Sequence, residues 1–147
     1  MTVGFEIDGR GALGSFQSLA RLLQGAAKRA VREAVQAAEK HAKQTELFKD
    51  KSGETRGSIH GEVEGLSGFV EAGGAAGFLQ HGTAPHLIIA HGQALRFEVA
   101  GQVMYRKMVQ HPGTQPRPFM SEAAEAGQDV LREQLDLHVN EIIRRGR

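Results

Sequence analysis

FQSLARLLQGAAKRAVREAVQAAEKHAKQTELF, residues 16–48, is the stretch that decides the fold. It is rich in Ala, Leu, Gln, Arg, Lys and Glu, which have high helix propensities. Its apolar residues recur every three or four positions, the period of one helix face. That face consists of Phe16, Leu19, Leu23, Ala27, Ala30, Ala34 and Ala38. The pattern predicts a long amphipathic helix with Ser15 as its N-cap. We expect its small residues to pack closely against a sheet or a neighbouring subunit.

Short strands and a second helix are predicted around this helix. Alternating apolar residues predict a strand at 3–7, with glycines separating it from the helix, and hairpins at 58–72 and 95–109. Residues 111–118 hold three of the four prolines and are predicted to be irregular. Helical periodicity returns at 119–145, with Pro118 as the first helical residue. The buried face of this helix is predicted to be Ala123, Val130, Leu131, Leu135, Val139 and Ile142.

These elements predict a single α+β domain spanning residues 1–147. We expect an antiparallel β-sheet of hairpins, with the long N-terminal helix and the C-terminal helix packed on one face of it. A chain of 147 residues with 40% hydrophobic and 24% charged residues is typical of a soluble globular protein. Residues 73–93, between the two hairpins, are expected to be mostly loop.

Composition narrows the classes of function. A net charge of +1 gives no general attraction to nucleic acids or membranes, and the absence of Cys excludes disulfides and thiolate catalysis. No apolar run approaches the roughly 20 residues of a membrane-spanning helix. The N-terminal residues lack the basic and apolar regions of a signal peptide. We therefore expect a folded intracellular protein with no membrane partner.

The central histidines raise the alternative of a metal-dependent hydrolase. His81, His86, His91 and His111 could supply imidazole ligands. However, the five-residue spacing of the first three matches no compact metal motif, and no carboxylate occurs between Glu71 and Glu98. Histidines in turns or at an interface are the favoured interpretation, so we expect no metal or other cofactor. Neither a Gly-x-Ser-x-Gly elbow nor a nucleotide-binding glycine motif is present, and no catalytic residue is predicted.

The charge of the long helix raises a second alternative, a small DNA-binding module. Residues 21–51 carry eight Lys or Arg against four acidic residues. A helix with that surplus could face phosphates, particularly if it were repeated around a ring. A solvated helix face accounts for the same residues and is the favoured interpretation for a single chain.

Three short motifs carry a family resemblance. SGETRGSI at 52–59 is followed by FLQHGTAPH at 78–86, and then by HPGTQPRPFM at 111–120, which leads into an Ala-rich helix. In this order they resemble the family of bacteriophage neck and tail-completion proteins, often called minor tail components, which includes the tail-completion protein of phage lambda. Two positions depart from the family pattern. Thr55 replaces the usual apolar residue, and Gln80 stands where an acidic residue is common.

The resemblance assigns an assembly or structural role to thirteen positions. They are Arg56, Ser58, Ile59, Gly82, Thr83, Pro85, His111, Pro112, Gly113, Thr114, Arg117, Pro118 and Phe119. Gly82 and Gly113 permit the positive φ of a sharp turn, and the prolines stiffen the link between sheet and helix. Phe119 is placed to anchor the last helix against the sheet. A rigid loop of this kind loses little entropy on docking, which suits an assembly surface.

The resemblance implies a non-enzymatic virion protein of a tailed phage or prophage, assembled in the cytoplasm of the bacterial host. It implies a ring, hexameric because tail tubes are sixfold, that forms or completes the neck or the tail end. Its partners would be further copies of this chain, other neck and tail proteins, and packaged DNA in the channel. A head-to-tail interface would close the ring. We expect its subunit contacts to come from helix 16–38 and from residues 73–93 and 111–118.

Overall fold

The computed structural model describes residues 10–145, and it confirms the predicted α+β class. Its helices are α1 (Arg10–Gln44), α2 (Glu54–Ser58), α3 (Ala76–His81) and α4 (Phe119–Arg145). Its strands are β1 (His60–Glu64), β2 (Ser67–Glu71), β3 (His86–Ile89), β4 (Leu95–Val99), β5 (Gln102–Arg106) and β6 (Met108–His111). The strand predicted at 3–7 lies outside the described residues.

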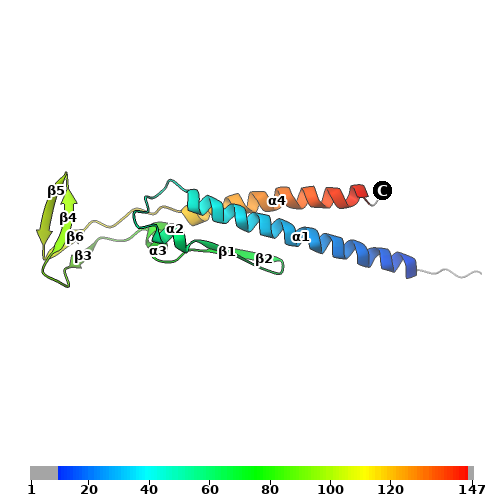
Figure 1. Cartoon of the computed structure of the whole chain (residues 1–147), viewed down its shortest axis with the longest axis horizontal. Coiled ribbons are helices and arrows are strands. Elements are labelled where there is room, and N and C mark those ends of the chain that lie inside the picture. Colours follow the sequence, from blue (N-terminus) through cyan, green and yellow to red (C-terminus); the bar gives the residue numbers. More distant parts are fainter. Residues whose placement is uncertain (1–9, 146–147) are drawn as a thin grey trace, which may run out of the picture.

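Helices α1 and α4 pack side by side in opposite directions and form the long axis of the molecule (Figure 1). The small residues of α1 allow this close approach. Ala26, Ala30 and Ala34 are buried, and a Cβ atom added at Gly127 of α4 would lie 3.0 Å from the Cβ of Ala38. The prediction that α4 and the Ala-rich face pack on a sheet is therefore corrected, because most of their contacts are with each other.

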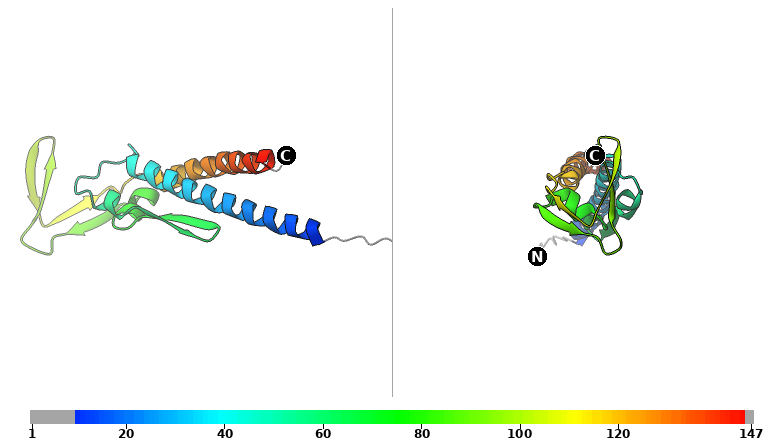
Figure 2. Two further views of the ribbon diagram at one scale, coloured as in Figure 1. Left: turned by 45° about the vertical axis from the view of Figure 1, so that its right-hand side comes forward. Right: turned by 90° about the vertical axis from the view of Figure 1, so that its left-hand side faces the viewer.

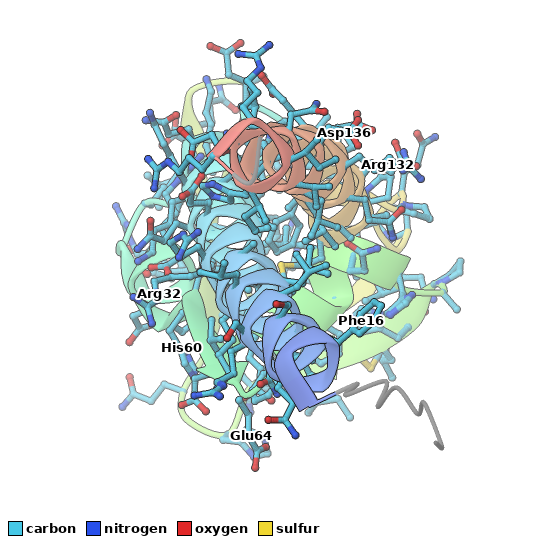
Figure 3. All side chains as sticks on the ribbon, turned by 90° about the vertical axis from the view of Figure 1, so that its right-hand side faces the viewer. Phe16, Arg32, His60, Glu64, Arg132 and Asp136 are labelled. Carbon is cyan, nitrogen blue, oxygen red and sulfur yellow. The ribbon has the colours of Figure 1, made fainter. Side chains whose placement is uncertain are left out.

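The first part of α1 is longer and less covered than predicted. The helix begins at Arg10, so Gly11, Gly14 and Ser15 lie within it and Ser15 is not its N-cap. Phe16 is 70% exposed and Leu19 and Leu23 are also exposed, which corrects the prediction of a continuous buried face. Figure 3 shows Phe16 on the surface near the N-terminal end of α1. In α4, the predicted face is correctly placed. Ala123 is buried, and Val130, Leu131, Leu135, Val139 and Ile142 are half-buried.

The strands form three separate two-stranded antiparallel sheets, where a single sheet of hairpins was expected. The β1–β2 hairpin lies along α1, with Gly61 and Gly68 against the side chain of Val35. The predicted hairpin at 95–109 is divided. Strands β4 and β5 pair with each other, whereas β6 pairs with β3, which lies in a segment predicted to be loop.

The core lies where the C-terminal end of α1 meets the start of α4. Phe119 and Ile59 are its largest fully buried side chains. The rings of Phe119 and Phe48 meet edge to face, with centroids 5.0 Å apart. Ala42, Ala76 and Ala123 complete this buried cluster. Phe119 thus anchors α4 as predicted, but against the segment that follows α1 and not against a sheet.

Candidate functional site

The motif at 52–59 closes the C-terminal end of α1. The guanidinium group of Arg56 donates hydrogen bonds to the carbonyls of Lys43, Thr45 (2.7 Å) and Phe48 (3.0 Å). It also lies 4.8 Å from the centroid of the Phe48 ring. The last carbonyls of a helix lack partners within the helix, and the planar fork of Arg can bind several acceptors at once. Arg56 therefore ties α2 to the end of α1.

Asp50 and Ser58 hold the same motif in place. The Asp50 carboxylate accepts hydrogen bonds from the backbone N–H groups of Gly53 (2.9 Å) and Arg56 (2.7 Å). The bond from Arg56 is the main reason that the pKa of Asp50 lies below its ordinary value. The Ser58 hydroxyl donates to the Thr55 carbonyl (2.8 Å) and accepts from the N–H of Gly73 (2.9 Å). Ser58 therefore links α2 to the turn that precedes α3.

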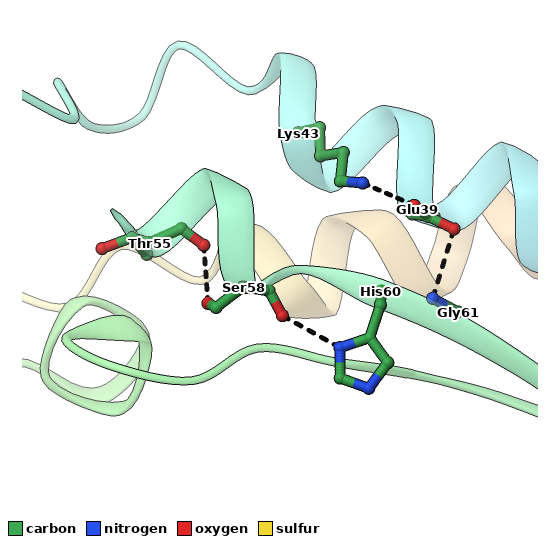
Figure 4. Close-up of polar contacts among 6 residues, drawn as sticks. All are labelled: Glu39, Lys43, Thr55, Ser58, His60 and Gly61. Carbon is green, nitrogen blue, oxygen red and sulfur yellow. Dashed lines mark hydrogen bonds and ion pairs between the residues drawn. The ribbon is translucent and has the colours of Figure 1, made fainter. Parts of the chain in front are cut away.

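The β1–β2 hairpin is fastened to α1 by Glu39 (Figure 4). Its carboxylate accepts a hydrogen bond from Lys43 at 2.6 Å and from the N–H of Gly61 at 3.2 Å. The bond from Lys43 is the largest cause that lowers the pKa of Glu39. Glu39 therefore joins the hairpin to α1, while Arg56 and Ser58 hold α2 in place and Ile59 is buried in the core.

The two Gly-Thr motifs meet across 31 residues of sequence and form what we call the clasp: Gly82, Thr83, Gly113 and Thr114. The two threonines exchange backbone hydrogen bonds of 3.0 and 3.1 Å. Their hydroxyl oxygens are also 3.1 Å apart. Gly82 and Gly113 have φ values of 71° and 85°. A Cβ atom at either glycine would collide with the backbone of the opposite motif, so only glycine fits these positions.

The remaining motif residues lie between the clasp and α4. Opposite each other in the β3–β6 ladder, the rings of His86 and His111 have centroids 5.0 Å apart. Nδ1 of His111 accepts a hydrogen bond from Gly113 N–H at 3.0 Å. Pro85 and Pro112 each lie next to the clasp in sequence. Arg117 N–H donates to the Leu79 carbonyl (2.7 Å).

The start of α4 is held by residues on both sides of the clasp. The helix begins at Phe119, one residue later than predicted, and the Pro118 carbonyl accepts the N–H of Glu122 at 3.1 Å. Gln80 accepts the N–H of Met120 (3.0 Å) and donates to the Ser121 hydroxyl (2.7 Å). Gln80 therefore caps α4 with its side-chain amide.

Residues 83–114 form a projection that we call the arm. It leaves the helical body at the clasp, continues as the β3–β6 ribbon, and ends in the β4–β5 hairpin, which lies across the far end of the ribbon (Figures 1 and 2). The ribbon carries apolar side chains on both faces, beside the polar pair His86 and His111 and Gln110. Ile88 and Val109 share one face, and Leu87, Ile89 and Met108 share the other. The latter three are exposed at 47, 59 and 58%.

These exposed apolar residues of the arm were missed by the sequence prediction. Strands that are buried on both faces have continuous apolar runs in place of alternation. The run Leu87-Ile88-Ile89 was the available signal, but its position in a predicted loop concealed it. A ribbon with apolar side chains on both faces that the rest of residues 10–145 leaves exposed is suited to binding a partner.

The structure bears on the two alternative functions, a metal-dependent hydrolase and a small DNA-binding module. Of the four central histidines, His86 and His111 are in ring contact. Within residues 10–145, no group of three or more His, Asp or Glu residues is arranged to hold a metal ion. The basic side chains Arg21, Lys28, Arg29, Arg32 and Lys40 are exposed on α1.

None of the helices within residues 10–145 has the length and apolar content needed to cross a membrane.

Comparisons with known proteins add no assignment. No family model, no curated protein and no solved structure matches the chain.

Proposed function

We propose that this chain is a non-enzymatic structural subunit of a tailed phage or prophage particle, located in the neck or at the tail end. The observation that carries the proposal is the arm, which presents uncovered apolar side chains on a ribbon that the clasp holds to the helical body. An isolated two-stranded ribbon is marginally stable in water. Its exposed apolar residues gain stability only when a partner covers them.

The three family-like motifs support the same conclusion. Their residues make the contacts that fix the arm and the helices: Arg56 at the end of α1, the glycines and threonines of the clasp, and Phe119 in the core. Fixing a docking surface before it binds reduces the entropy lost on binding. In the proposed particle, copies of the chain form a hexameric ring that contacts other neck and tail proteins. The exposed basic residues of α1 could then face packaged DNA in the channel.

The direct test is to locate the chain on particles. An epitope-tagged chain would be expressed during particle production and detected by immunogold electron microscopy. We expect gold at the head–tail junction or the tail end, and we expect deletion of the chain to leave tails that are incomplete or not joined to heads. Normal, infectious particles without the chain would contradict the proposal.

A second test concerns the purified chain. Light scattering combined with negative-stain imaging should show closed rings at high protein concentration or in the presence of tail proteins. Enzymatic turnover with a bound metal would favour the hydrolase alternative instead. DNA binding by the isolated subunit that falls steeply with salt would favour the DNA-binding alternative.

A further inference from the structure

Within residues 10–145, no other part of the chain packs extensively over the arm. Its elements pair with each other, β3 with β6 and β4 with β5, and neither pair packs extensively against the helices. Figure 1 shows the arm pointing away from the body. Tyr105 of the β4–β5 hairpin is 59% exposed, and Val99 and Val103 are exposed as well. The uncovered surface therefore extends from the ribbon to its tip.

The body carries an apolar groove that is also unfilled. It lies between α1, β2 and α4 and has a volume of about 300 Å³. Val31 and Ala34 of α1 form part of its floor, Leu66 and Phe69 lie on the hairpin side, and Gln128 lies on the α4 side. Leu66 and Phe69 are 52 and 42% exposed. The groove can therefore receive large apolar side chains from outside the subunit.

The charges around the groove and on the arm are complementary. The sequence from 57 to 95, which includes the β1–β2 hairpin, carries three glutamates (Glu62, Glu64 and Glu71) and no Lys or Arg. The first half of α4, from 119 to 131, carries Glu122, Glu125 and Asp129 and again no basic residue. In contrast, the arm carries Arg96, Arg106 and Lys107 against Glu98. The hairpin and the first half of α4, two of the elements that border the groove, are thus acidic, and the arm is basic.

We propose that the arm of one copy of this chain binds in the groove between α1, β2 and α4 of the next copy. The two surfaces lie on different parts of the molecule, so the contact is head-to-tail and repeats from copy to copy, as a ring requires. Apolar residues of the arm fill the groove, while the basic residues of the arm face the acidic hairpin and α4. The choice of a second copy as the partner rests on the proposed function. The inference adds which two surfaces of the chain make the contact.

The absence of cysteine from the sequence allows a clean cross-linking test. One variant carries Met108→Cys on the arm, and another carries Gln128→Cys at the groove. The two proteins are mixed and treated with a short thiol-specific cross-linker. We expect a covalent heterodimer from this mixture. We expect none when Gln128→Cys is replaced by Lys51→Cys, which is also exposed but lies in the connector after α1. Equal yields from the two mixtures would overturn the proposal.

Charge reversal tests the same contact without any cross-link. Arg106→Glu with Lys107→Glu on the arm, or Glu62→Lys with Glu64→Lys on the hairpin, should each weaken self-association by at least about tenfold. All four residues are exposed, so the fold of each variant should be retained, and circular dichroism checks this. A mixture of the two double variants should recover association, because the unchanged arm of one variant meets the unchanged hairpin of the other, and the reversed arm meets the reversed hairpin.

Each outcome of this experiment decides the proposal. Recovery in the mixture supports it. Unchanged association in both variants, loss without recovery, or a wild-type chain that stays monomeric at all concentrations overturns it. Failure here is distinguishable from failure of the proposed function. If immunogold labelling finds the chain on the particles but the arm–groove cross-link does not form, the proposed function stands and only the arm–groove contact is rejected.

Discussion

The Phe119→Ala substitution measures how firmly α4 is anchored to the body. The Phe119 side chain is 0% exposed, and its ring meets that of Phe48 edge to face. Replacing a fully buried Phe by Ala removes transfer free energy and leaves a cavity, at a cost of about 3–5 kcal/mol. Three of the five other residues in the buried cluster are alanines, Ala42, Ala76 and Ala123, whose short side chains cannot fill the vacated space. We therefore expect a loss in the upper part of that range, about 4–5 kcal/mol.

Urea denaturation followed by circular dichroism gives this quantity directly. Phe78→Ala is the matched control, because Phe78 is the same residue type in nearby α3 but is 66% exposed. The control should change the free energy of unfolding by no more than about 0.5 kcal/mol. A loss below about 1 kcal/mol for Phe119→Ala, or similar losses for the two variants, would show that Phe119 does not anchor α4.

Three further substitutions test the contacts that surround this core. Arg56→Lys keeps the charge but cannot bind three carbonyls at once, so it should lower the free energy of unfolding by about 1–3 kcal/mol; an unchanged urea midpoint would contradict this role. Gly113→Ala introduces a collision with the Thr83 carbonyl and should destabilise the chain more than Gly74→Ala does. Gly74 also has a positive φ (60°), but no atom lies within 4 Å of a Cβ added there. Equal changes in melting temperature would show that the backbone of the clasp moves to accommodate the added Cβ. Asp50→Asn should reduce the loss of stability in acid. Because the folded pKa of Asp50 is below the ordinary 3.8, its contribution is complete above that pH and is lost as the pH falls through the folded value. Parallel stability–pH curves for the wild type and Asp50→Asn would argue against this assignment.

The helices and the fold class could be predicted from sequence because helical periodicity extends over many turns. Pairing of strands could not be predicted in the same way. Residues 103–109 were predicted to form one alternating strand, although Lys107 falls among the apolar positions Val103, Tyr105 and Val109. Lys107 is the residue between β5 and β6. Alternation reports which side chains share a face, but it does not identify the partner strand. The partner of β6, strand β3, lies about twenty residues earlier and has no alternation, because both of its faces are apolar.

The candidate site was predicted in part. The glycines of both Gly-Thr motifs were expected to adopt positive φ values, and Gly82 and Gly113 do so. That the two motifs bind each other was not predictable, because a turn motif carries no information about what faces it. Arg56 was identified only by resemblance. Its role at the end of α1 depends on three carbonyls that come together only after the chain has folded.

The clasp also bears on how such a chain can diversify. Thr83 and Thr114 form a doubly hydrogen-bonded antiparallel pair, and a pair of this kind can be closed by a two-residue turn. The segment between them leaves and re-enters the helical body at one place, so we expect it to tolerate changes of length and sequence. A lineage can lengthen, shorten or swap it to suit a new neighbour without rebuilding the helices beneath.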